Sequence, residues 1–185
     1  MQSLKKVTIF ANRRAYTRSK YSNNIARMGD FCRNLSEIQL QHCESLDSLE
    51  NLLLAFKATL TILYLKKCNF TKLKLRNIRL FALKRLVLED CCGLSKQVMM
   101  GFLEAAPNLE IINCERFFLL SQIINISVKL RVLILVSSPQ LTDAMFCYIV
   151  HSCPMLEVVA LCKSSLLTDW SVGKLVPARE VLVLY

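Results

Sequence analysis

The sequence predicts an α/β solenoid of right-handed course, in which short parallel strands stack into a concave sheet and helices or irregular segments cover the convex side. Three observations predict this fold class. A nine-residue frame recurs along the chain, its apolar residues alternate as in a strand, and several links between frames have helical spacing and capping residues. A recurrence every roughly 20 to 50 residues is typical of repeat folds.

The frame is clearest in three copies, LSEIQLQHC from Leu35, LTILYLKKC from Leu60 and LKRLVLEDC from Leu83. Looser copies start near residues 4, 109, 130 and 156, and a shortened copy starts near residue 179. Successive starts lie 31, 25, 23, 26, 21, 26 and 23 residues apart. This lettering and spacing match a leucine-rich repeat. We therefore expect residues 1–185 to form a single domain of about eight repeats.

Each position of the frame has an expected place in the fold. Positions four and six should face the core, whereas positions three, five and seven should face the open side of the sheet, because side chains alternate along a strand. Position nine is a turn, where a small buried Cys, Asn or Ser can bond the backbone. Cys43, Cys68 and Cys91 fill this turn position, Cys32 and Cys153 fall at helix ends, and Cys114 falls on an inward strand position.

Two links carry complete helix signals. Ser95 can cap a helix whose apolar residues include Val98 and Phe102, and Pro107 follows it. Thr142 can cap a helix that ends at Pro154. Ile25, Met28 and Cys32 suggest a third helix, whereas the links at 69–82 and 118–129 are too short or too irregular for a full helix to be predicted.

The stretch Cys153-Pro-Met-Leu-Glu157 and the tripeptide Leu141-Thr-Asp143, which recurs as Leu167-Thr-Asp169, resemble the cysteine-containing repeats of F-box/leucine-rich-repeat proteins, within the ribonuclease-inhibitor-like superfamily. The resemblance covers essentially the whole chain. It implies that the repeats hold the target of a ubiquitin ligase. An F-box is a separate helical segment, and a frame that begins at Leu4 leaves no room for it. Because the last strand is also apolar where a solenoid has a polar capping repeat, we expect a fragment of a longer solenoid.

The open-face positions divide the sheet into two halves. They are mixed and mostly polar in the first five repeats and almost entirely apolar in the last three. The apolar positions form the predicted partner-binding face: Val132, Ile134, Val136, Val158, Ala160, Cys162, Val181, Val183 and Tyr185. This face could dock an apolar peptide or helix, with Tyr185 as an anchor. Alternatively, a further segment of the chain or a second copy covers it.

Basic residues concentrate in the first half of the chain, where residues 1–92 carry 17 Lys and Arg against 7 Asp and Glu, while residues 93–185 carry 7 of each. One acid-free run is predicted to form a basic edge that could meet an acidic partner or phosphates: Lys66, Lys67, Lys72, Lys74, Arg76, Arg79, Lys84 and Arg85. The alternative is a solvated surface. Nucleic acid is disfavoured, because the interleaved Phe70 and Phe81 have core spacing.

The sequence gives little support for a membrane, secreted or zinc-binding protein. The longest apolar runs are too short to span a bilayer, no secretory signal opens the chain, and no C-x-x-C pair or zinc frame includes His42 or His151. An odd count of nine cysteines favours a reducing compartment, cytoplasmic or nuclear. Residues 1–29 also resemble a mitochondrial transit peptide, although the repeat frame at Leu4 explains the same residues.

The sequence therefore predicts a protein-binding module rather than an enzyme, without cofactor, metal or membrane contact. Cys162 is the best candidate for a reactive thiol, but no His or Asp stands beside it to activate it. The family resemblance implies substrate recognition for a ubiquitin ligase, with ligase components as further partners. The alternatives are another leucine-rich-repeat interaction or sensing domain of the intracellular-receptor type, and a polyanion or nucleic-acid binder that uses the basic N-terminal half.

Overall fold

The computed structural model describes residues 4–10, 28, 31–43, 49–71, 73, 75, 77–115, 128–170 and 180–184, the last group by its backbone. Within these residues the chain forms an eight-stranded parallel sheet whose strands follow one another in sequence order. The strands are β1 (Lys6–Phe10), β2 (Glu37–Gln41), β3 (Ile62–Lys66), β4 (Arg85–Glu89), β5 (Ile111–Glu115), β6 (Val132–Val136), β7 (Val158–Cys162) and β8 (Glu180–Leu184).

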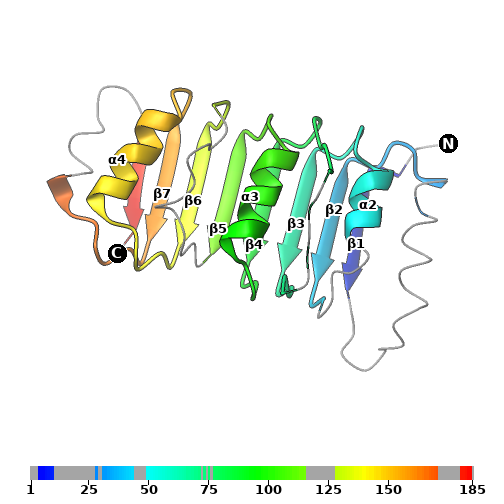
Figure 1. Ribbon diagram of the computed structural model, residues 1–185, viewed down its shortest axis with the longest axis horizontal. Coiled ribbons are helices and arrows are strands. Elements are labelled where there is room, and N and C mark those ends of the chain that lie inside the picture. Colours follow the sequence, from blue (N-terminus) through cyan, green and yellow to red (C-terminus); the bar gives the residue numbers. More distant parts are fainter. Residues whose placement is uncertain are drawn as a thin grey trace.

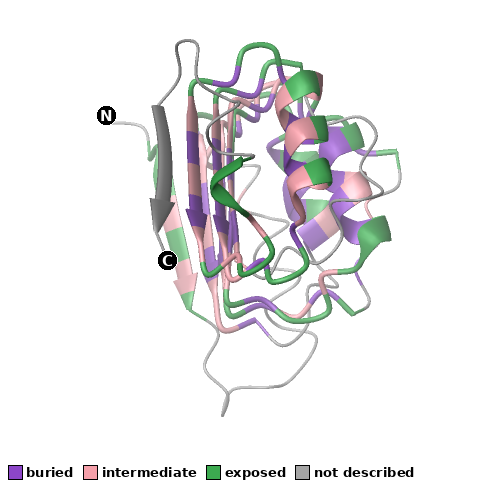
Figure 2. Ribbon diagram, turned by 90° about the vertical axis from the view of Figure 1, so that its left-hand side faces the viewer, coloured by how far each residue is buried: buried purple, intermediate pink, exposed green. Residues whose placement is uncertain are grey.

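Three described helices, α2 (Leu49–Ala55), α3 (Lys96–Ala105) and α4 (Asp143–Ser152), lie on one face of this sheet (Figure 1). A view along the sheet shows two layers, with strands on one side and helices on the other (Figure 2). The predicted α/β class with a parallel sheet is thus confirmed, and the arrangement is compatible with a solenoid-like fold.

The core lies between the two layers. In β2, β3, β5, β6 and β7 the fourth and sixth frame positions are buried and the positions between them are half-buried. The leucine that opens each of six frames is at most 1% exposed: Leu35, Leu60, Leu83, Leu109, Leu130 and Leu156. Each such side chain contributes about 1.5–3 kcal/mol by leaving water.

Backbone hydrogen bonds repeat where the strands begin. The carbonyl of Lys5 accepts from the N–H groups of Ser36 and Glu37, and the carbonyl of Thr61 accepts in the same way from Lys84 and Arg85. The same forked pattern continues from Glu110 to Arg131 and Val132. Residues at the second frame position are therefore neighbours along one edge of the sheet.

The strand ends also share a conformation. The eighth frame position has a left-handed backbone in five repeats, at His42, Lys67, Asp90, Ser137 and Lys163, with φ of 50–58°. This φ turns the chain out of the sheet and brings the ninth position beneath it. As predicted, the thiols there bond the backbone: Cys68 donates to Lys66 O at 3.3 Å, and Cys91 donates to Leu65 O at 3.3 Å.

Both helices with complete signals are confirmed. Ser95 Oγ accepts from Val98 N at the start of α3, and Thr142 Oγ1 accepts from Met145 N at the start of α4. Helix α2 was not predicted, although Leu49, Leu52, Leu53 and Phe56 have helical spacing and are all buried. Met28 is helical and its carbonyl accepts from Cys32 N, but most of the third predicted helix falls outside the described residues.

The two phenylalanines of the 69–82 link differ from each other. Phe70 is buried against Phe102 in an edge-to-face contact, with ring centroids 6.0 Å apart. Phe81, which was expected to reach the core, is 62% exposed. That prediction was wrong because the described residues of this link form turns and irregular backbone, so the spacing of the two phenylalanines does not decide which of them faces inward. Leu80, just before Phe81, is the residue that packs inward instead.

The observed register of β8 differs from the predicted frame by one residue. Its backbone register aligns Glu180 with Val158, Leu182 with Ala160 and Leu184 with Cys162. Val181 and Val183 therefore share register positions with the inward Val159 and Leu161, not with the open face. Residues 181–184 are all apolar, so the sequence alone gives no phase for their alternation. Tyr185, the predicted anchor, lies outside the described residues.

Candidate functional site

Six apolar side chains form a continuous surface on the open side of β6 and β7. Val132, Ile134 and Val136 pair in register with Val158, Ala160 and Cys162, and we call these six residues the apolar face. All six are half-buried, as expected for neighbours in a sheet whose outer surface has no second layer of described helices. The structure thus brings together six of the nine residues predicted for partner binding.

The polar half of the open side is held by its own contacts. Lys6 Nζ lies 2.5 Å from Glu37 Oε1, and Gln39 Nε2 donates to the same oxygen at 2.9 Å. Thr8 then donates to Gln39 Oε1 at 3.2 Å. These residues occupy β1 and β2, so their polar groups already have partners within the sheet.

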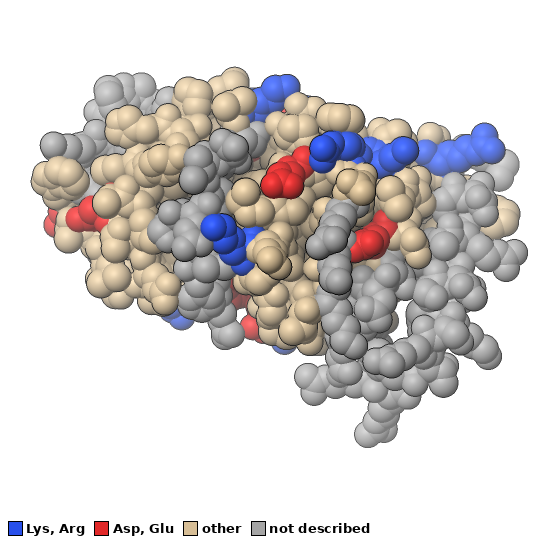
Figure 3. Space-filling model, in the orientation of Figure 1, with Lys and Arg blue, Asp and Glu red and all other residues tan. Residues whose placement is uncertain are grey.

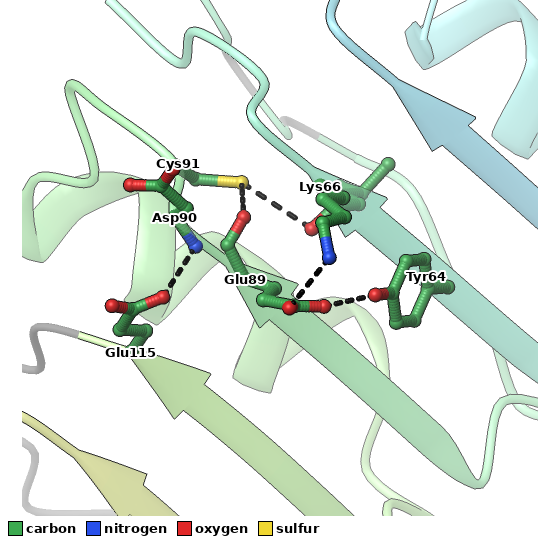
Figure 4. Close-up of polar contacts among 7 residues, drawn as sticks. Tyr64, Lys66, Glu89, Asp90, Cys91 and Glu115 are labelled. Atoms are coloured by element: carbon green, nitrogen blue, oxygen red, sulfur yellow. Dashed lines mark hydrogen bonds and ion pairs between the residues drawn. The ribbon is translucent and has the colours of Figure 1, made fainter. Parts of the chain in front are cut away.

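A second polar group joins β3 to β4 (Figure 4). Glu89 accepts hydrogen bonds from the Tyr64 hydroxyl and from Lys66 Nζ, the latter at 2.7 Å. The hydrogen bond from Lys66, and then that from Tyr64, holds the pKa of the Glu89 carboxyl below its ordinary value. Burial, and then the bond to Glu89, raises the pKa of Tyr64. This group therefore keeps a charged carboxylate and a neutral phenol at neutral pH.

Glu115 marks the border between the polar half and the apolar face. Its Oε2 accepts from the backbone N–H of Asp90 at 2.9 Å, in place of the carbonyl that serves the equivalent turns (Figure 4). In the register, Glu115 is aligned with Val136 of the apolar face. A charged residue thus occupies the register position next to the apolar face, with its carboxylate bonded toward β4.

Three turn cysteines lie side by side beneath the strand ends. Asn69 N donates to Cys43 O, and Cys92 N donates to Cys68 O, so the turns of Cys43, Cys68 and Cys91 are neighbours. The hydrogen bond with Cys68, together with burial, raises the pKa of both Cys43 and Cys91. The same hydrogen bonds, from Cys43 and then from Cys91, lower the pKa of Cys68. Cys43 and Cys91 are therefore protonated at neutral pH, and a protonated thiol is a poor nucleophile.

The remaining thiols lie in different environments. Burial raises the pKa of Cys114 to about 12. Cys162 is half-buried on the apolar face, where the sequence placed it. Within the part of the chain that the structure describes, no group of three or more His, Cys, Asp or Glu residues could hold a metal ion. No helix in the same part is long and apolar enough to cross a membrane.

The predicted basic edge is not one edge. Lys66 and Lys67 lie where β3 ends, whereas Lys84 and Arg85 lie where β4 begins, and these are opposite ends of parallel strands. Lys66 is paired with Glu89, and Lys84 lies 2.9 Å from Glu110. Lys72, Lys74 and Arg76 fall outside the described residues. The prediction of a single edge was wrong because the run spans a link that connects one end of the sheet to the other.

Charge is distributed unevenly on the helix side of the molecule. The strands begin at the upper edge of the molecule in this view, and Lys and Arg side chains follow that edge toward the β1 end of the sheet (Figure 3). Other basic side chains are scattered among acidic ones.

No protein-family model and no curated protein matches the chain.

Proposed function

We propose that this chain is a leucine-rich-repeat solenoid that acts as a non-catalytic protein-interaction module and binds its partner on the apolar face. The repeat assignment is supported by strands that fall on the same frame positions, three to seven, in seven successive copies. It is also supported by the left-handed turn at position eight and the buried leucine at position one.

The observation that carries the binding proposal is the exposure of the apolar face. Six apolar side chains in two neighbouring strands are only half-buried, and the described helices lie on the other side of the sheet. Burial of the remaining apolar area gives a favourable free energy of about 25 cal/mol per Å². The surface is built from small or branched apolar side chains, so it fits the apolar side of a helix or of an extended segment.

The setting we propose is target recognition for an F-box-like ubiquitin ligase. It is supported by the cysteine at the turn position, by Cys153-Pro-Met-Leu-Glu157 before β7, and by the recurring Leu-Thr-Asp tripeptide. All nine cysteines are free thiols, which favours a reducing compartment, cytoplasmic or nuclear. The alternative setting is another interaction or sensing domain that uses the same repeats and the same apolar face.

The test compares partner capture by the wild type with capture by Ile134→Asp. A charge in the centre of the apolar face should abolish capture, because docking would bury an unpaired carboxylate. Gln41→Asp is the matched control, since it places the same charge at a half-buried open-face position of β2. Circular dichroism checks that both variants fold. Equal capture by the wild type and Ile134→Asp would remove the apolar face as the binding site.

A further inference from the structure

The turn before β2 and the turn before β4 each expose one phenylalanine and one arginine. Phe31-Cys32-Arg33 precedes β2 and Arg79-Leu80-Phe81 precedes β4. Phe31 is 79% exposed and Phe81 is 62% exposed, and both arginines are exposed as well. In each turn the middle residue packs inward, with Leu80 fully buried and Cys32 against the core. The inward residue therefore turns an aromatic ring and a guanidinium to the solvent.

The two turns are structurally equivalent and flank a third. Leu35 N donates to Cys32 O and Leu83 N donates to Leu80 O, both at 3.0 Å. The turn between them, closed by Leu60 N to Phe56 O at 2.9 Å, exposes Lys57. Because β2, β3 and β4 are adjacent strands, the outer turns lie about 10 Å apart, or two strand spacings.

We call this surface the strand-start edge: Phe31, Arg33, Lys57, Arg79, Phe81 and Lys84, all exposed. Lys84 belongs to it because it directly follows Leu83. The corresponding turns before β5 and β7 instead begin with Pro107 and Pro154, so among these four described turns only those before β2 and β4 combine a phenylalanine with an arginine. The row of Lys and Arg along the upper edge in Figure 3 runs on the same side of the molecule.

We propose that the strand-start edge binds a single-stranded nucleic acid. Unpaired bases stack on exposed aromatic rings, and neighbouring cations neutralise the phosphates that join those bases. Two phenyl rings on one surface, about two strand spacings apart and each two residues from an arginine, offer both contacts together. A duplex keeps its bases stacked on one another and would leave the rings unused, and an acidic peptide would require only the cations.

Fluorescence anisotropy with a labelled oligouridylate tests this proposal. Binding by the wild type should weaken with salt. Because Lys84 is paired with Glu110, we count three cations, Arg33, Lys57 and Arg79, and expect a slope of log K against log salt of about −2, at roughly 0.7 per phosphate contact. Phe31→Ala/Phe81→Ala should lower the affinity about tenfold or more without changing that slope. Arg33→Ala/Lys57→Ala should reduce the slope by about 1.4.

The control is Lys163→Ala/Trp170→Ala, which removes an exposed cation and an exposed ring near the other end of the sheet and should bind as the wild type does. Circular dichroism establishes that each variant is folded. Wild-type affinity in the phenylalanine variant would overturn the proposal and indicate a purely electrostatic polyanion surface. Equal competition by a duplex of the same length, or no binding by the wild type, would also overturn it. Ile134→Asp should bind the oligonucleotide normally, so this inference and the proposed function fail independently.

Discussion

Thr168 donates both its backbone N–H and its hydroxyl to the carboxylate of Asp143, at 2.9 and 2.7 Å. The two residues belong to the two copies of Leu-Thr-Asp, at 141–143 and 167–169. Asp143 also begins α4, where a carboxylate is favoured by the helix dipole. The two copies of the tripeptide are therefore in direct contact, through the threonine of the second copy and the aspartate of the first.

Asp143→Ala should destabilise the fold by about 1–2 kcal/mol, because it removes the acceptor of both bonds. Thr168→Val should cost about 0.5–1 kcal/mol, since the backbone bond remains. Urea unfolding followed by circular dichroism measures both free energies, and Ser165→Ala at an exposed position nearby is the control. A free energy of unfolding for Asp143→Ala equal to that of the wild type would show that the two copies do not stabilise each other.

At the ninth frame position, a buried cysteine should give a higher free energy of unfolding than a buried serine. Ser138 is fully buried, and its Oγ has no hydrogen-bond partner among the described residues. Ser138→Cys and Ser138→Ala should each raise the free energy of unfolding by roughly 1 kcal/mol, because a buried hydroxyl without a partner is costly. Cys68→Ser should lower it by a similar amount or more. These values also come from urea unfolding, and a loss of stability in both Ser138 variants would contradict the explanation.

The nine thiols should react in two groups. Cys92 is exposed, and Cys32, Cys147 and Cys162 are half-buried, so iodoacetamide at mildly alkaline pH should modify these four first. Cys43, Cys68, Cys91, Cys114 and Cys153 are buried and should react only after denaturation. The raised pKa of Cys43, Cys91 and Cys114 slows their reaction further. Peptide mass spectrometry over time gives the order, and early labelling of Cys43 or Cys91 would argue against these environments.

Stability should depend on Glu89 at acid pH. Its pKa in the folded state is held below the ordinary value of 4.5, chiefly by the bond from Lys66. The stabilisation is therefore present above about pH 4.5 and is lost as the pH falls through the lowered folded-state pKa. Lys66→Gln should be less stable than the wild type near pH 7, and this difference should shrink at acid pH. Glu89 is partly exposed, so we expect a small effect, measured by urea unfolding at several pH values. A difference that stays constant down to pH 3 would exclude this contribution.

The sequence by itself determined the strands and most of their faces. The first seven frames predict strands at the residues where the structure has them, because a short period-two alternation within a recurring frame is a local signal. The caps at Ser95 and Thr142 are equally local, since a cap involves residues three positions apart. Helix α2 could have been predicted in the same way, from the helical spacing of Leu49, Leu52, Leu53 and Phe56.

Only the tertiary structure decided how the copies meet. The phase of β8 depends on its hydrogen bonds with β7, because a run of apolar residues has no alternation of its own. The exposure of Phe81 depends on Leu80 taking the inward place in a link without a helix. The basic residues separate onto opposite ends of the strands, and Phe31, Arg33, Arg79 and Phe81 come together, because parallel stacking aligns equivalent positions of successive repeats rather than neighbours in the chain.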